Sequence, residues 1–326
     1  RNNYAIQHME FSQTTSSNDI LQKAEEVKIN VPWGHIAGKW WGPKHIRPIV
    51  CLHGWQDNAG TFDTLIPHLP PHMSYLSLDL PGHGLSSWIP DGMFYHSGDY
   101  LYMLLLIMKQ HKWERISLMA HSLGSILSFS FSSLFPEKVD LFIGIDALKP
   151  HIRPITIVPE LIRGLVSSYI VADERNRDKS EPPSYTYEEM VEKLHLATNK
   201  SIDRESCKYL LARNIKPSTK SPGKFYFSRD SRLKSYYYGY VSQELNLLLA
   251  KQIRAPYLFI KASNSTFYED KKYFDECIEV LQQSPVFEFH TVEGSHHVHL
   301  NEPTKVSGLI ADFINKYRPT EQTSDL

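Results

Sequence analysis

The chain has 326 residues, of which 41% are hydrophobic and 22% charged, and its formal net charge is −1. This composition is typical of a globular protein, and the near-zero charge excludes an electrostatic attraction to nucleic acid or to an anionic membrane surface. No apolar run in the sequence reaches the length of a membrane span. We therefore expect a small-molecule substrate, with no nucleic-acid partner and no membrane span.

The cysteines are few and widely spaced: Cys51, Cys207 and Cys277. They form no metal-ligand pattern, and an odd number makes a poor disulfide framework. We therefore expect a reducing compartment, cytoplasmic or organellar, with the peroxisome as one option. We expect no metal and no cofactor, and the sequence leaves the oligomeric state open.

Short apolar segments alternate with helical patterns along the first half of the chain. After a polar arm at residues 1–22, an antiparallel hairpin at a sheet edge is predicted at 27–31 and 35–41. The next predicted elements are strands at 48–52, 73–78, 115–120 and 139–145, with helices at 61–69 and 96–111 and a third that ends near residue 136. This alternation predicts a parallel sheet with right-handed crossovers.

The pattern changes between residues 149 and 234, where prolines separate helical patterns at 188–196 and 202–213. No strand pattern is strong there, so we predict a helical lid at 149–234, inserted between two core segments, 1–148 and 235–326. Alternation then resumes, with strands at 257–261 and 286–292, helices at 270–282 and 302–317, and a disordered tail after Pro319.

One pentapeptide, Ala120-His121-Ser122-Leu123-Gly124, lies where an apolar strand must turn sharply into a helix. A nucleophile elbow, usually written Gly-x-Ser-x-Gly, has this form. The helix N-terminus at Ser122 would favour developing negative charge. An ordinary helix N-cap serine would show the same spacing, so a catalytic interpretation needs a base and an acid elsewhere.

The loop after the last predicted strand supplies candidate bases. Three histidines lie in it, and His296 is our first choice because it directly follows the flexible Gly294-Ser295 turn. His297 is second and His299 third. A surface histidine cluster or an adventitious metal site is the alternative interpretation.

The triad acid departs from the usual pattern. The expected position follows the strand at 257–261, but Ser265 occupies it, and the next carboxylates are Glu269 and Asp270. Asp146 ends the neighbouring strand at the same edge of the sheet. We favour Asp146, with Asp270 or Glu269 as alternatives.

Acyl transfer also needs donors for the tetrahedral oxyanion. We expect these to be the backbone N–H groups of Leu123, directly after the nucleophile, and of Trp55. Gly54 lets the backbone turn in closely. We expect His53, Gly54 and His121 to contact the substrate.

These motifs together resemble those of the lidded α/β-hydrolase fold family. His53-Gly54-Trp55 and the segments 79–86, 121–124 and 294–296 fall in that family's order and at its intervals. Segments 145–146, 229–234 and 296–299 are most similar to the animal serine hydrolase-like proteins, including the insect kraken type.

This resemblance implies a mostly parallel eight-stranded α/β sheet flanked by helices, with an inserted helical lid. It also implies a Ser–Asp–His hydrolase whose acid is Asp146. Loop 79–86 would be structural, and His83 would not be catalytic.

A serine at the elbow argues against family members that attack with an aspartate. We predict a serine hydrolase that cleaves carboxylic esters of small, largely apolar substrates through an acyl-enzyme. Aromatic residues of the lid and its return are expected to line the pocket: Tyr169, Tyr185, Tyr187, Phe225, Tyr226, Phe227, Tyr236, Tyr237, Tyr238 and Tyr240. The alternatives are a carbon–carbon bond hydrolase of the meta-cleavage-product type and a slow or non-catalytic ligand-binding homologue.

Overall fold

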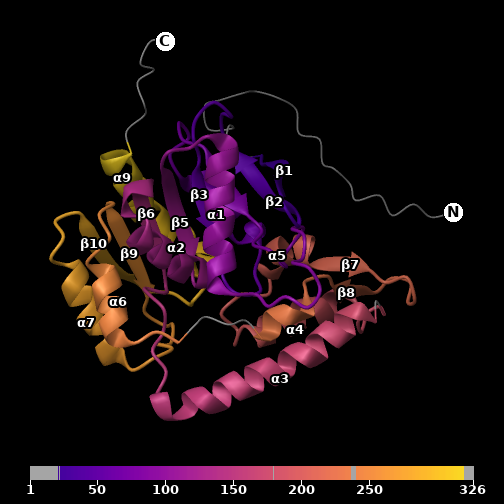
Figure 1. Cartoon of the computed structure of the whole chain (residues 1–326). Coiled ribbons are helices and arrows are strands. Elements are labelled where there is room, and N and C mark those ends of the chain that lie inside the picture. The colour runs from indigo at the N-terminus through magenta and orange to yellow at the C-terminus, as the bar shows by residue number, and fades with distance from the viewer. Residues whose placement is uncertain (1–20, 22, 179, 236–239, 319–326) are drawn as a thin grey trace, which may run out of the picture.

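The computed structural model describes residues 21, 23–178, 180–235 and 240–318. The predicted N-terminal arm at 1–22, apart from residue 21, and the predicted tail after Pro319 therefore lie outside the described residues. An eight-stranded sheet in the order β1-β2-β4-β3-β5-β6-β9-β10 forms the centre of the molecule (Figure 1). Its strands are β1 (Glu25–Val31), β2 (Gly34–Trp41), β3 (Ile49–Leu52), β4 (Tyr75–Leu78), β5 (Ile116–His121), β6 (Val139–Ile145), β9 (Tyr257–Ala262) and β10 (Phe287–Val292).

The sheet is mostly parallel, as predicted. β1 pairs antiparallel with β2, and β2 with β4, whereas the six strands from β4 to β10 run parallel to one another. The predicted hairpin therefore forms one edge of the sheet. Because parallel strands end at the same edge, the segments that follow β3, β5, β6 and β9 can meet there.

Helices cover both faces of the sheet and bury a core on each. Successive strand residues point to opposite faces: Val50 and Leu52 of β3 belong to one core, and Ile49 and Cys51 to the other. The first core is covered by α1 (Ser97–His111), α2 (Leu123–Leu134), α6 (Gln243–Ala250) and α7 (Lys271–Leu281). The second is covered by α9 (Thr304–Tyr317), α8 (Val298–Asn301) and the 3₁₀ turns η2 (Ala59–Phe62) and η3 (Ile66–His68).

The predicted helix at 61–69 is wrong, because the structure has only the two short turns η2 and η3 there. Pro67 has no N–H to donate and Pro70 follows closely, so an α-helix cannot continue through this segment. The helices at 96–111 and 270–282 are confirmed as α1 and α7 within one residue at each end. Helix α6 has no counterpart among the predicted elements.

The segment between β6 and α6 adds no strand to the main sheet within the described residues. It contains η5 (Ile155–Ile157), α3 (Val158–Arg177), α4 (Tyr187–Ala197), α5 (Cys207–Asn214), β7 (Ile215–Pro217), β8 (Phe225–Phe227) and η6 (Ser231–Ser235). The helical pattern at 188–196 corresponds to α4, and the pattern at 202–213 corresponds to α5, which begins only at Cys207. The small β7–β8 sheet and the long α3 have no counterpart among the predicted elements.

Two buried arginines hold this segment to the core. The guanidinium of Arg213 lies 2.7 Å from the carboxylate of Asp79, directly after β4. Arg232 pairs with Asp230 at 2.7 Å and also donates to the carbonyl oxygen of Ile89, also at 2.7 Å. Because every one of these charged groups is nearly inaccessible to water, breaking either pair would leave a buried charge uncompensated.

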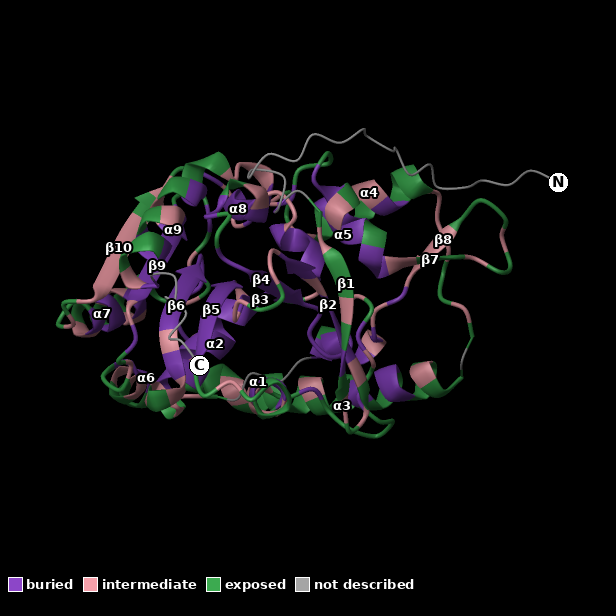
Figure 2. Ribbon diagram, turned by 90° about the horizontal axis from the view of Figure 1, so that it is seen from above, coloured by how far each residue is buried: buried purple, intermediate pink, exposed green. Residues whose placement is uncertain are grey.

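The longest helix, α3, lies along the inserted segment and is largely exposed (Figures 1 and 2). With the preceding turn it spans Ile155–Arg177, which is long and apolar enough to cross a membrane by length and composition. No membrane span was expected from the sequence, because no continuous apolar run is long enough, and in this segment Glu160 and Arg163 interrupt the run.

The packing of α2 on β3 gives a stability prediction. A Cβ atom at Gly124 would lie 2.2 Å from the carbonyl oxygen of Leu52, so Gly124→Ala must push the helix from the strand. We expect it to lower the free energy of unfolding by about 1–3 kcal/mol, measured by urea denaturation. Gly308→Ala in α9 is the control, since no atom lies within 4 Å of its Cβ position. Equal stabilities for the two variants would contradict this account of the packing.

Candidate active site

Ser122 occupies the sharp turn between β5 and α2. Its backbone has φ 51° and ψ −117°, a conformation that non-glycine residues rarely adopt. The neighbouring segments hold it there: the N–H of Ser122 donates to Ile145 in β6, and the N–H of Gly124 donates to His53 after β3. The turn therefore presents the Ser122 hydroxyl at the carboxyl edge of the sheet, as the pentapeptide predicted.

His296 lies against this hydroxyl. Its Nε2 atom is 2.9 Å from Ser122 Oγ, and its Nδ1 atom is 2.5 Å from Asp146 Oδ2. A carboxylate oxygen can only accept a hydrogen bond. Nδ1 therefore carries the proton, which leaves Nε2 free to accept one from the serine.

Asp146 directly follows β6 and is fully buried at its side chain. Its backbone is left-handed, with φ 61°, a conformation that aspartate tolerates better than most residues. Oδ1 accepts hydrogen bonds from the N–H of Ala262 at 2.9 Å and from Nζ of Lys261 at 2.7 Å. Both carboxylate oxygens are thus occupied, which fixes the orientation of the group toward His296.

The two alternative acids have other roles. Glu269 forms a buried ion pair with Lys149 at 2.6 Å and accepts the N–H of Ile152. Asp270 caps the N-terminus of α7. Ser265, in the usual position for the acid, lies 3.5 Å from His296 Nδ1, farther away than Asp146.

The protonation states follow from burial and from these contacts. Burial lowers the pKa of His296, and the hydrogen bond to Asp146 offsets this only in part, so the ring is in its basic form near neutral pH. Burial alone would raise the pKa of Asp146. The hydrogen bond from His296 and the charge of Lys261 outweigh burial, so this pKa lies below its usual range and the carboxylate is ionised.

Two backbone N–H groups near Ser122 are free to bind an oxyanion. Leu123 is the first residue of α2, where an α-helix offers no acceptor for an N–H. The N–H of Trp55 donates to no backbone oxygen within the described residues. The Trp55 side chain is 43% exposed, and its indole N–H is fixed to the carbonyl oxygen of Leu233 in η6 at 2.7 Å.

The expected contact of His53 and His121 side chains with a substrate requires correction, because both are 0% exposed. His53 uses both ring nitrogens within the protein, on Gly54 O and on the N–H of Leu80. His121 lies beneath the elbow, with Nε2 on the carbonyl oxygen of His296. Gly54 does lie at the site, since a Cβ atom there would be 3.2 Å from Ser122 Cβ.

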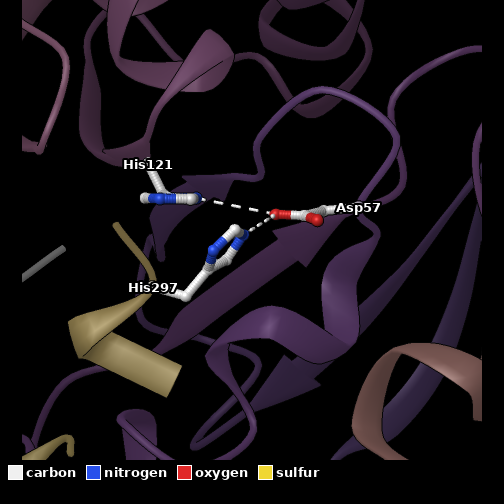
Figure 3. Close-up of side chains that lie close together, drawn as sticks. All are labelled: Asp57, His121 and His297. Atoms are coloured by element: carbon white, nitrogen blue, oxygen red, sulfur yellow. Dashed lines mark hydrogen bonds and ion pairs between the residues drawn. The ribbon is translucent and has the colours of Figure 1, made fainter. Parts of the chain in front are cut away.

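The other two candidate bases point away from Ser122. His297 Nε2 lies 3.2 Å from Asp57 Oδ2, and His299 Nε2 lies 3.0 Å from Thr61 Oγ1. Asp57 also lies 3.6 Å from His121 Nδ1, and these three side chains form a buried cluster that could hold a metal ion (Figure 3).

Two residues at the site, Asp57 and Lys261, are not among those predicted from the sequence. Lys261 carried a signal, because a lone charge within the otherwise uncharged β9 is expected to have a buried partner. Asp57 had no comparable signal in the sequence, because its position three residues after Gly54 does not indicate a partner.

The aromatic residues expected to line the pocket lie in several environments. Tyr169 is buried and bonds to the backbone of Tyr95. Tyr185 pairs with Phe225, and both pack with Phe227 against the core of the inserted segment. The predicted residues Tyr236, Tyr237 and Tyr238 lie outside the described residues.

Comparison with known proteins places the chain in a family. Residues 47–303 match the family model described as alpha/beta hydrolase fold. A probable serine hydrolase of Drosophila melanogaster is 35% identical over 90% of this chain and 88% of its own length. A serine hydrolase-like protein of Danio rerio is 36% identical over 95% of this chain and 94% of its own length.

A solved structure supports the same assignment. The hypothetical protein PA1622 of Pseudomonas aeruginosa superposes with a TM-score of 0.76 at 28% identity, over 89% of this chain and 99% of that one. The chain therefore belongs to the alpha/beta hydrolase family, among its serine hydrolase-like members.

Proposed function

We propose that this hydrolase cleaves carboxylic esters of small, largely apolar alcohols or acids through an acyl-enzyme on Ser122. The line of hydrogen bonds from Ser122 through His296 to Asp146 carries the proposal. A neutral hydroxyl is a poor nucleophile, and the basic nitrogen of His296 lies within reach of its proton.

In the first half of the reaction, Ser122 Oγ bonds to the ester carbonyl carbon while its proton passes to His296 Nε2. The oxyanion is held by the N–H groups of Trp55 and Leu123. Collapse of this intermediate breaks the ester C–O bond, and the leaving oxygen takes the proton from His296. Asp146 stabilises the imidazolium that forms between these two transfers.

In the second half, water attacks the acyl carbon and gives a proton to His296. The bond from the acyl carbon to Ser122 Oγ then breaks, and Oγ takes the proton back. The acid product leaves, and the resting hydrogen bonds are restored. Every catalytic group in these steps is a side chain or backbone N–H of this chain.

The exposed aliphatic residues of α3 support an apolar substrate, and we infer that one face of this helix borders the approach to Ser122. Residues four and seven positions before Tyr169, namely Leu165 and Ile162, share its helix face. Tyr169 bonds to the core at Tyr95, so this face is directed inward, yet Ile162 is 37% exposed. Partly uncovered aliphatic side chains on an inward face suit an acyl or alkyl chain.

Ser122→Ala tests the nucleophile. We expect hydrolysis of a short-chain p-nitrophenyl ester to fall by at least about a thousandfold, and labelling by a fluorophosphonate probe to disappear. Ser167→Ala, on the exposed surface of α3, should keep both. A folded wild-type protein that neither hydrolyses esters nor takes the probe would favour the ligand-binding alternative. Turnover of diketone substrates alone would favour the carbon–carbon bond hydrolase.

Asp146→Asn tests the acid. We expect turnover of the same ester to fall by about 10⁴-fold, because His296 loses the carboxylate that holds its Nδ1–H tautomer. Asp270→Asn is the matched control, since asparagine also caps a helix and this side chain lies outside the triad. The assignment is wrong if the control loses activity and Asp146→Asn keeps it.

Acyl-length dependence tests the apolar face. We expect Ile162→Ser and Leu165→Ser each to lower kcat/KM for an octanoate ester by about tenfold, and to change the value for acetate much less. Val171→Ser is the control, because Val171 lies on the opposite side of α3 and is 54% exposed. An equal effect on both esters would indicate that this face does not bind the chain.

A further inference from the structure

The side chains of Asp57, His121 and His297 form a buried cluster next to the proposed triad in the chain (Figure 3): His121 directly precedes Ser122, and His297 directly follows His296. These side chains come from the loop after β3, the last residue of β5 and the loop after β10. Each is at most 5% exposed. Asp57 Oδ2 lies 3.2 Å from His297 Nε2 and 3.6 Å from His121 Nδ1, and the three atoms all lie within 4.8 Å of one another.

The hydrogen bond on the far side of His121 fixes its neutral tautomer. Nε2 lies 2.9 Å from the carbonyl oxygen of His296, and a carbonyl oxygen only accepts. The proton of a neutral His121 ring is therefore on Nε2. Nδ1 then directs a lone pair toward Asp57, and this buried atom has no hydrogen-bond donor among the described residues.

The same reasoning applies to His297. Its Nδ1 atom lies 2.9 Å from Ser201 Oγ, which also lies 2.8 Å from the carbonyl oxygen of Thr198. When the single hydroxyl proton of Ser201 is donated to Thr198, Ser201 accepts from His297 Nδ1. The Nε2 atom then has a lone pair, which also faces Asp57.

With this arrangement of Ser201, three acceptor atoms converge with no proton between them when both rings are neutral. Such a cluster is repulsive unless a cation lies at its centre. In protein metal sites, ligating histidines donate their other ring N–H to a protein oxygen, as His121 does to His296 and as His297 does to Ser201 in this arrangement.

Two of the distances within the cluster fit a tetrahedral ion. In a tetrahedral site with metal–ligand bonds of about 2.0 Å, neighbouring ligand atoms lie about 3.3 Å apart, close to the 3.2 and 3.6 Å from Asp57 Oδ2 to the two rings. The two ring nitrogens lie within 4.8 Å of each other. Gly54 borders this space, since a Cβ atom there would lie 2.9 Å from Asp57 Oδ2 and 3.0 Å from His121 Nδ1.

We propose that Asp57, His121 and His297 bind one Zn²⁺ ion, although the sequence analysis expected no metal. Two imidazoles and one carboxylate form a donor set that zinc favours. His121 precedes Ser122 and His297 follows His296, so the ion joins the loops that carry the serine, the histidine and the oxyanion donors. Its role is to position these loops.

Metal binding by the full chain tests this inference without any measurement of activity. We expect protein stripped with a chelator to bind one Zn²⁺ per chain in calorimetry and to show a raised Tm. Co²⁺ should give the intense visible absorption of a tetrahedral site. Asp57→Asn and His297→Gln should each weaken Zn²⁺ binding by at least about a hundredfold.

His299→Gln is the matched control. Its ring lies in the same loop, 4.2 Å from that of His121, but its Nε2 atom faces Thr61 rather than the cluster. We expect this variant to bind Zn²⁺ like the wild type.

Three results would overturn the proposal. If stripped wild-type protein binds no Zn²⁺ at neutral pH, a proton rather than a metal joins the three side chains. If the ligand variants bind as tightly as the wild type, the site is an adventitious ion only. If these variants do not fold, the wild-type Co²⁺ spectrum decides, and the weak absorption of an octahedral ion would contradict the assignment.

Discussion

The carboxylate of Asp146 is the group on which the geometry of the site depends. It is withdrawn from water at the end of β6, where an unpaired charge would be costly. Three hydrogen-bond donors stabilise the buried charge: His296 donates to one oxygen, and Lys261 and the backbone N–H of Ala262 donate to the other. The same contacts that stabilise the buried charge fix the direction in which His296 is held. The contacts that stabilise this edge of the sheet therefore also orient the His296 ring.

The position of Ser122 depends on close packing rather than on charge. The elbow is strained, and it persists because β3 and β6 hold its backbone on both sides. Gly124 and Gly144 leave no side chain where α2 crosses the sheet, and a Cβ atom at either would lie within 2.6 Å of a neighbouring atom. Helix α2 can thus approach β3 closely enough to leave the N–H of Leu123 beside the serine hydroxyl.

The inserted segment is joined to the core through buried polar contacts. Arg213 forms an ion pair with Asp79 of the core, whereas Arg232, paired with Asp230 of its own segment, donates to the carbonyl oxygen of Ile89 in the core. These contacts are directional, and the segment also has a small apolar cluster that includes Leu300 of α8. Helix α3 contributes few buried side chains to either core, which leaves its aliphatic residues uncovered. A segment fixed at a few charged points and largely open along α3 is well suited to cover a site that substrates must enter.

The sequence by itself determined the chain order of the eight strands of the main sheet, because buried strands of a parallel sheet are short continuous apolar runs that differ from amphipathic helices. It also identified Ser122 from the local spacing of small residues, and it favoured His296 and Asp146 because both follow strands at one sheet edge. It failed at 61–69, where prolines override helical periodicity.

Only the tertiary structure decided which side chains touch. Lys261 and Asp146 are separated by 115 residues, and Asp57 and His297 by 240. Local sequence patterns carry no information about pairs so far apart in the chain. The pairing of the strands brings these residues, and the loops that follow the strands, side by side. The choice among His296, His297 and His299 also needed the tertiary structure, because neighbouring residues in a loop point in different directions. The three rings contact Asp146, Asp57 and Thr61, respectively, and these contacts determine which ring faces the serine.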